Sequence, residues 1–287
     1  MKIRVPATTA NLGPGFDSFG LALTMYLELE VLEETKEWEI EHELDNIPRD
    51  ETNLIIKTAT HVCPNLSPHH LKMTTDIPTA RGLGSSSSAI VAGIELANQL
   101  GHLNLSKEKI VEIATEVEGH PDNVAPAILG GFVVANKIEE HIYYTQHNFP
   151  ECELIVAIPN YELLTSASRQ VLPERLTYEY AVEASSIANV ALSSLLSGNL
   201  EQACFLMEQD KWHEPFRAAL VPELKRIREE KKQLGFYTAL LSGAGPTILI
   251  LCPKESLVKT KNFIKEKFKT FDIQHVRVQS TGVEIVA

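Results

Sequence analysis

Closely spaced cysteines are missing from this sequence. The chain has four cysteines, Cys63, Cys152, Cys204 and Cys252, and no two of them form a CxxC motif. Disulfide-stabilised domains and structural zinc sites usually depend on such spacing, so the sequence argues against both. We therefore expect reduced thiols, which are typical of a cytoplasmic protein.

Positive charge and long apolar runs are also scarce. Lysine and arginine number 26 against 38 aspartates and glutamates, which gives a formal net charge of -12. A nucleic-acid-binding protein normally presents a basic surface to phosphates, so we expect no nucleic-acid partner. The first residues, MKIRVPATTANLGPGFDS, lack the apolar segment of a signal peptide, and the most apolar stretch, TALLSGAGPTILILC, is interrupted by Gly, Ser and Pro. We expect no membrane partner either.

The length of 287 residues favours two domains. Alternating runs in the N-terminal part, KIRVPAT, LTMYLELEVLE and EWEIEHE, predict strands. Helical spacing follows over 54–61, and again from an N-cap at Ser106 to a stop at Gly119 and Pro121. A second series begins near residue 151 with ELIVAIP and ends in one last strand, HVRVQSTGVEIV. This order predicts an α+β fold with domains at 1–150 and 151–287.

The stretch PTARGLGSSSSA, from Pro78 to Ala89, precedes an apolar helical pattern. A flexible linker or a single serine N-cap would not need two glycines and four serines. Glycines that expose backbone N–H groups, serine hydroxyls and a helix N-terminus together form an anion site, for which phosphate is the expected ligand. A Walker A loop is excluded because no lysine follows Gly84, and a dinucleotide fingerprint lacks its third glycine at Ser87.

The same stretch resembles the phosphate loop of the GHMP kinases, Pro-x-x-x-Gly-Leu-Gly-Ser-Ser-x-Ala. PATTANLGPGFDSFGLAL resembles the first motif of this family in the form found in its homoserine kinases, and LSGAGPTILIL resembles the third motif. With EGHPDNVAPAILGGF, these blocks span nearly the whole chain. The resemblance implies the GHMP kinase fold: an N-terminal domain like ribosomal protein S5 domain 2 and a C-terminal ferredoxin-like domain, with the active site between them. It also implies phosphoryl transfer from ATP, with Mg²⁺, to the hydroxyl of L-homoserine.

The resemblance implies that the adenine lies near Asn53 and the phosphates lie on the glycine- and serine-rich loop. The residues expected to bind ATP are Asn53, Pro78, Arg81, Gly82, Leu83, Gly84, Ser85, Ser86, Ser87 and Ser88.

Mg²⁺ prefers oxygen ligands, and KIVEIATEVEG offers Glu112, Glu116 and Glu118. The resemblance favours Glu116 and adds a hydroxyl from Ser85 or Ser86, between which the sequence does not choose.

An amino-acid substrate carries a carboxylate, which the planar fork of arginine matches bidentately. The resemblance assigns this role to Arg169 and Arg217, and it places Thr165 in the site as a catalytic candidate. Asn11 and Asp17 fit the hydroxyl and ammonium end of the substrate, although an Asx turn is a structural alternative for both.

The resemblance also bears on the proton transfer. In mevalonate kinases and galactokinases, an aspartate stands at the position that aligns with Asn123, and asparagine cannot act as a base. We therefore expect direct attack by the substrate hydroxyl, with Asn123 orienting and binding it, while the neighbouring Asp122 stays open as a base. His120, beside a proline turn, is expected to be structural.

Three functions stay open at this point: a homoserine kinase of threonine biosynthesis, another GHMP small-molecule kinase of the mevalonate type, and a non-catalytic nucleotide-binding module. The family resemblance further implies a homodimer.

Overall fold

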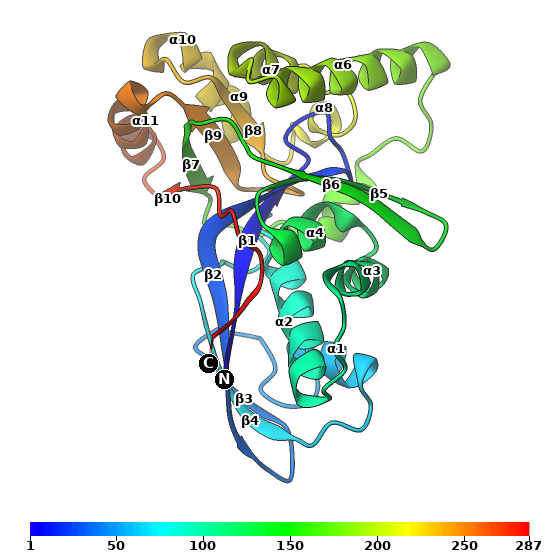
Figure 1. Cartoon of the computed structure of the whole chain (residues 1–287). Coiled ribbons are helices and arrows are strands. Elements are labelled where there is room, and N and C mark those ends of the chain that lie inside the picture. The colour runs from blue at the N-terminus through cyan, green and yellow to red at the C-terminus, as the bar shows by residue number, and fades with distance from the viewer. Residues whose placement is uncertain (287) are drawn as a thin grey trace.

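A large β-sheet organises the N-terminal part of the chain (Figure 1). The computed structural model describes residues 1–286, and within them seven strands form this sheet in the order β11-β1-β2-β4-β3, with β5 beside β2 and β6 beside β5. All neighbours are antiparallel except β3 and β4. The strands are β1 (Lys2–Ala10), β2 (Phe19–Glu34), β3 (Glu39–Glu41), β4 (His69–Thr75), β5 (Phe132–Ile138), β6 (His141–His147) and β11 (Glu284–Val286).

The burial of β1 changes along its length. Ile3 and Val5 are fully buried and alternate with partly exposed Lys2 and Arg4, as expected for a strand with one face on the core. From residue 6 onward every side chain is buried. The end of β1 approaches the second part of the chain there: the N–H of Gly243 donates to the carbonyl of Ala10 over 3.1 Å. The loop that follows β1 therefore begins at the junction between the two parts.

Helices cover one face of the first sheet (Figure 1). They are α1 (Leu54–Val62), α2 (Ser85–Leu100), α3 (Lys107–Glu118) and α4 (Pro121–Leu129). Helix α2 is buried on most sides, with Ile90, Ile94 and Ala97 in the main hydrophobic core. A helix fixed so firmly gives the loop at its N-terminus a rigid support.

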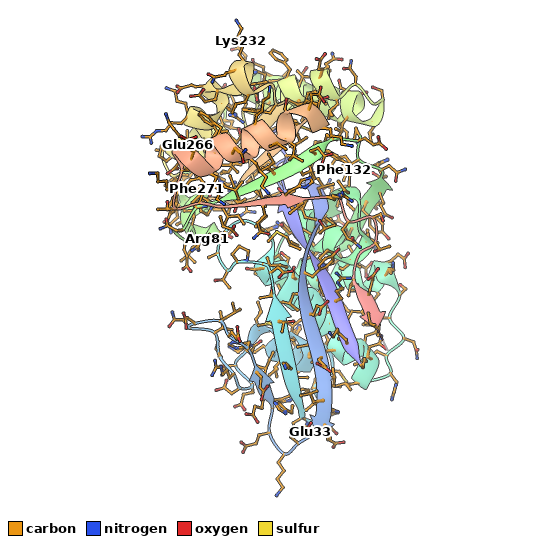
Figure 2. The ribbon with its side chains drawn as sticks, turned by 90° about the vertical axis from the view of Figure 1, so that its left-hand side faces the viewer. Glu33, Arg81, Phe132, Lys232, Glu266 and Phe271 are labelled. Atoms are coloured by element: carbon orange, nitrogen blue, oxygen red, sulfur yellow. The ribbon has the colours of Figure 1, made fainter. Side chains whose placement is uncertain are left out.

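A second, antiparallel sheet of four strands lies beyond the first within the described residues, in the order β10-β7-β9-β8. Its strands are β7 (Glu153–Ile158), β8 (Thr238–Leu241), β9 (Ile248–Cys252) and β10 (Asp272–Val276). The remaining helices are α5 (Thr165–Gln170), α6 (Tyr178–Leu196), α7 (Leu200–Met207), α8 (Glu214–Arg217), α9 (Pro222–Glu229), α10 (Lys231–Leu234) and α11 (Lys254–Lys267). Figure 2 shows an elongated molecule, with Glu33 near one end and Lys232 near the other.

The α+β class is confirmed, and so are the predicted helix at 54–61 and the cap at Ser106, whose side chain accepts from the N–H of Lys109. The predicted stop at Gly119 and Pro121 is also confirmed, because α3 ends at Glu118 with Gly119 as its C-cap, and Pro121 then begins α4. Proline at the first helical position needs no N–H partner and has a favourable φ, so the same residue serves as a start. No helix among residues 1–286 has both the length and the apolar character needed to cross a membrane.

The prediction of one last strand, HVRVQSTGVEIV, is wrong. Its beginning lies in β10 of the second sheet, and its end forms β11, which pairs with β1 of the first sheet. The chain between them is held against the first sheet, because the N–H of Gln279 donates to Ala22 O and its carbonyl accepts from Gly131 N. The range 151–287 thus contains a strand of the first sheet, and the two-domain division itself stays a prediction.

Candidate active site

A cavity of about 230 Å³ lies where the two parts of the chain meet. The loop after β1, the segment before α2 and the start of α4 line one side, and α5, α8 and the turn at Gly243 and Ala244 line the other. Figure 2 shows Arg81, one of the lining residues, at this junction. Arg81 connects both parts, since its guanidinium donates to the carbonyls of Thr79, Pro159 and Asn160.

The N-terminus of α2 opens into the cavity. Ser85, Ser86 and Ser87, its first three residues, line the cavity together with Gly82 and Gly84. The first N–H groups of a helix have no intrahelical acceptor, and the N-cap residue Gly84 supplies no side chain to satisfy them. These donors and the helix dipole therefore favour an anion at this end.

Close packing explains the glycine at position 84. Its φ is +69°, and a Cβ there would lie 2.1 Å from Thr8 Oγ1 and 3.3 Å from Asn123 Oδ1. Any side chain would displace these two groups, so the glycine lets the anion-binding turn lie directly against them.

Four of the predicted ATP-binding residues do not line this cavity. Leu83 lies in the hydrophobic core, and the Ser88 hydroxyl donates to the carbonyls of Pro6 and Gly84. The side chain of Asn53 caps α1 by accepting from Ile55 N and donates to Pro48 O. Pro78 lines an adjacent cavity of about 300 Å³, which shares Arg81 with the first.

The structure brings Glu118 to the serines, whereas the family resemblance favoured Glu116. The hydroxyls of Ser86 and Ser87 donate to the two carboxylate oxygens of Glu118 over 2.9 and 2.8 Å. Glu116 is exposed and outside the cavity, and Glu112 pairs with a surface lysine. Two residues along an α-helix rotate the side chain by roughly 200°, so Glu116 and Glu118 face different directions.

Charged groups of opposite sign, one from each side, face each other across the cavity. Arg169, in α5, binds Asp17 through two hydrogen bonds of 3.1 and 2.6 Å. The side chain of Asn11 holds Asp17 across the loop, since the N–H of Asp17 donates to Asn11 Oδ1, while Asn11 Nδ2 donates to Gly243 O. Both members of the ion pair stay about one-third exposed, so a ligand can reach them. Thr165, the first residue of α5, lines the cavity beside them.

Arg217 also lines the cavity, and its side chain is almost fully buried. Its Nε donates to Ser168 O and its Nη1 donates to Gly243 O, each over 3.1 Å. Burial lowers the pKa of Arg217 to about 10, and the nearby charge of Arg169 adds to this effect. A group with that pKa keeps its positive charge at neutral pH.

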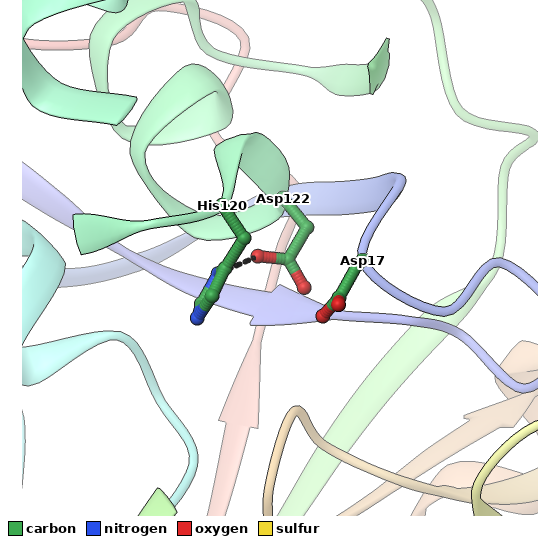
Figure 3. A group of neighbouring side chains, drawn as sticks. All are labelled: Asp17, His120 and Asp122. Atoms are coloured by element: carbon green, nitrogen blue, oxygen red, sulfur yellow. Dashed lines mark hydrogen bonds and ion pairs between the residues drawn. The ribbon is translucent and has the colours of Figure 1, made fainter. Parts of the chain in front are cut away.

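Asn123, Asp122 and His120 lie at the start of α4. The hydroxyl of Thr8 donates to Asn123 Oδ1 over 2.9 Å. Figure 3 shows the Asp122 carboxylate between His120 and Asp17, and His120 Nδ1 donates to Asp122 Oδ1 over 2.6 Å. Burial alone would lower the pKa of His120, but the hydrogen bond and negative charge of Asp122 outweigh it and raise that pKa. His120 also lines the cavity, beyond the structural role expected for it.

Two parts of the chain match family models for this architecture. Residues 53–131 match the N-terminal domain of GHMP kinases, and residues 191–270 match the C-terminal one. Over 286 residues, the chain is 55% identical to a homoserine kinase of Listeria innocua, with 99% of both chains covered. The chain belongs to the homoserine kinases of the GHMP kinase family.

Other comparisons agree with this membership. A homoserine kinase of Enterococcus faecalis is 54% identical over 286 residues, which cover 99% of this chain and all of that one. The solved homoserine kinase structure from Cytophaga hutchinsonii has a TM-score of 0.86 at 25% identity, covering 100% of this chain and 97% of the other. A mevalonate kinase structure from L. major, at 18% identity and a TM-score of 0.76, covers 98% of this chain and 97% of its own, and shows the shared fold alone. The GHMP kinase fold expected from the sequence is thus confirmed, and the family implies the use of ATP.

Proposed function

We propose that this kinase transfers the γ-phosphoryl group of ATP to the hydroxyl of L-homoserine, giving O-phospho-L-homoserine and ADP for threonine biosynthesis. One observation carries the proposal. An anion-binding helix end and a pair of opposite charges, Arg169 and Asp17, face one cavity. L-homoserine carries a carboxylate, an ammonium and a hydroxyl, so a site for both charges can hold its backbone while the hydroxyl points to the phosphate.

In this proposal the phosphates lie on the backbone N–H groups at the start of α2, between Gly82 and Ser87. The nucleoside extends toward the adjacent cavity, which contains Pro78 and shares Arg81. Asn53 would affect nucleotide binding only through the position of α1, because its side chain caps that helix.

The oxygen donors beside α2 fit Mg²⁺. Glu118 supplies a carboxylate and Ser86 a hydroxyl, which are the hard ligands that Mg²⁺ prefers. Asp17, His120 and Asp122 also bring donor atoms within 4.8 Å of one another. That group fits less well, because Arg169 already neutralises Asp17 and the histidine offers nitrogen. We therefore assign the metal to Glu118 and Ser86 in place of Glu116; when bound, it would neutralise charge on the phosphates.

Substrate binding then exchanges one ion pair for two. The α-carboxylate of homoserine takes the guanidinium groups of Arg169 and Arg217, and its ammonium takes the carboxylate of Asp17. Arg169 and Asp17 pair with each other before the substrate binds. When they separate, each pairs with a charged group of the substrate, so neither charge is left uncompensated.

Asn123 orients the attacking hydroxyl, and Thr8 fixes the Asn123 side chain. The substrate oxygen forms a bond to the γ-phosphorus while the bond from that phosphorus to the ADP oxygen breaks. The hydroxyl proton leaves to a phosphate oxygen or to solvent. Asp122 accepts a hydrogen bond from His120, and this supports a role in holding the start of α4 in preference to that of a base. Thr165, at the cavity wall, adds a hydroxyl near the reacting groups.

Steady-state ADP formation tests the function. The enzyme is supplied with Mg·ATP and, in parallel, with L-homoserine, mevalonate, galactose or no acceptor. We expect turnover with L-homoserine above the level without acceptor. Turnover with mevalonate or galactose alone would favour another GHMP kinase, and ATP binding without any turnover would favour a non-catalytic module.

The proposal includes a homodimer in the cytoplasm. Helix α6 exposes the apolar side chains of Tyr178, Val182 and Val190, which supports a contact with a second copy. All four cysteines are unpaired thiols, as expected in a reducing compartment. Sedimentation analysis of wild type and of Val182→Glu tests the dimer: a single monomeric species in both would contradict it.

A further inference from the structure

A buried imidazole lies behind Arg217. His213, which is fully buried, directly precedes α8, and Arg217 is the last residue of that helix. The imidazole Nδ1 lies 3.0 Å from Arg217 Nη1, and its Nε2 lies 3.0 Å from the carbonyl oxygen of Gly13. Gly13 belongs to the loop between β1 and β2, which also carries Asp17. His213 thus contacts both the arginine and the loop that form the substrate end of the cavity.

These two contacts define one protonation state. Arg217 Nη1 can only donate, so Nδ1 must accept with its lone pair, and the Gly13 carbonyl can only accept, so Nε2 must carry the proton. Burial, together with the charge of Arg217, lowers the pKa of His213 to about 4, although Asp210 and Asp17 act in the opposite direction. The imidazole is therefore neutral at neutral pH and keeps its acceptor toward Arg217.

His213 is the side-chain partner among three groups that fix the Arg217 guanidinium. The other two are the carbonyls of Ser168 and Gly243, which any residue at those positions would provide. The ring of Phe16 stacks on the imidazole at 5.4 Å and lies 5.3 Å from the Arg217 guanidinium. The direction of Arg217 toward the cavity therefore depends on the identity of residue 213.

Asp210 fixes the backbone that carries the imidazole. Its carboxylate accepts from the N–H groups of His213 and Glu214 over 3.0 and 2.8 Å. Helix α8 has only four residues, so these bonds set the orientation of the whole segment from His213 to Arg217.

We propose that His213 is a positioning residue for substrate recognition: its Nδ1 lone pair directs Arg217 toward the α-carboxylate, and its Nε2–H secures the loop that carries Asp17. The inference rests on the proposed function, because an amino-acid substrate supplies the carboxylate.

Two variants of His213 separate its two nitrogens. His213→Asn keeps an acceptor near the Nδ1 position and loses the Nε2 donor, whereas His213→Gln keeps a donor near Nε2 and loses the acceptor. We expect the KM for homoserine to rise about tenfold or more in the Gln variant, as for a lost bond to a charged group. The Asn variant should show a clearly smaller rise, and the KM for ATP should stay at the wild-type value in both.

Thermal unfolding distinguishes this role from a general loss of structure. Asparagine leaves the larger void, so the Asn variant is expected to be the less stable of the two and still to bind homoserine better. If the KM for homoserine rises equally in both variants, or follows the loss of stability, the positioning role is wrong.

Crystal structures of the two variants without ligand give a readout that does not depend on the substrate. We expect a displaced Arg217 guanidinium in the Gln variant and a retained one in the Asn variant. An undisplaced guanidinium in the Gln variant would overturn the inference. If the wild-type enzyme did not phosphorylate homoserine, the proposed function would fail, and this comparison would still decide what His213 does to Arg217.

Discussion

Replacement of Gly84 by alanine tests whether the phosphate-binding turn and the hydroxyl-orienting asparagine are coupled. The new Cβ would lie 2.1 Å from Thr8 Oγ1, and this hydroxyl donates to Asn123 Oδ1. Thr8 cannot keep its place, so its hydrogen bond to Asn123 should break. The side chain that orients the substrate hydroxyl would then lose its support.

The expected cost has two parts. An alanine with φ near the observed +69° costs about 1 to 2 kcal/mol in backbone strain. Loss of the Thr8–Asn123 hydrogen bond adds about 0.5 to 1.5 kcal/mol. The free energy of unfolding should therefore fall by about 1.5 to 3.5 kcal/mol in all. A misplacement of Asn123 by about 1 Å should reduce kcat roughly 100-fold, because geometry dominates such a transfer.

Gly198→Ala is the matched control. Gly198 has a φ of +78°, and apart from its neighbours in the chain no atom of the described residues lies within 4 Å of a Cβ there. This variant should lose only the backbone term, about 1 to 2 kcal/mol, and keep the wild-type kcat. The assay is steady-state ADP release at saturating ATP and homoserine, with thermal unfolding of each variant. A folded Gly84→Ala enzyme with the kcat of wild type would refute the coupling.

Four further predictions concern the charged groups. Glu118→Gln should raise the Mg²⁺ concentration for half-maximal activity at least about tenfold, since even residues that only hydrogen-bond to a metal ligand have effects of that size. Glu116→Gln should leave this concentration unchanged, and equal responses of the two variants would contradict the metal assignment. Arg169→Ala should reduce kcat/KM for homoserine roughly 10- to 150-fold through loss of a charge-assisted contact, and an unaltered value would exclude the carboxylate role. Asp122→Asn should keep kcat within about tenfold of wild type, because a lost general base would cost about 100-fold or more. The folded-state pKa of His120 lies above its ordinary 6.5, so the pairing of His120 with Asp122 stabilises the fold below pH 6.5, and this stabilisation is lost as pH rises through the raised value. Asp122→Asn should therefore lower the free energy of unfolding more at about pH 6 than at about pH 9. A loss that does not depend on pH would contradict this.

The sequence predicted local features well where local chemistry decides them. Two glycines and a run of serines before an apolar helical pattern indicate an anion site, and the structure has these serines at the start of α2. The pairing of Arg169 with Asp17 joins residues 152 positions apart, so no spacing rule could have predicted it. Only the family resemblance brought those two residues into one site.

Other features depend on tertiary packing and could not be predicted. Glu116 and Glu118 are equivalent in composition, and the packing of α3 against the start of α2 decides which of them meets the serines. His213 precedes Arg217 by four residues in HEPFR, a spacing that places two side chains on one helix face. That signal becomes meaningful only once Arg217 is known to be buried beside the cavity.

The return of the chain to its first sheet limits how the two parts can move. The chain passes from the first sheet to the second between β6 and β7, and it passes back between β10 and β11 (Figure 1). These two connections resist separation of the two sheets and free twisting of one against the other. Rotation about the line between the connections is therefore the relative motion that they oppose least. Any closure around bound substrates should therefore be a rotation about one axis that narrows the cavity.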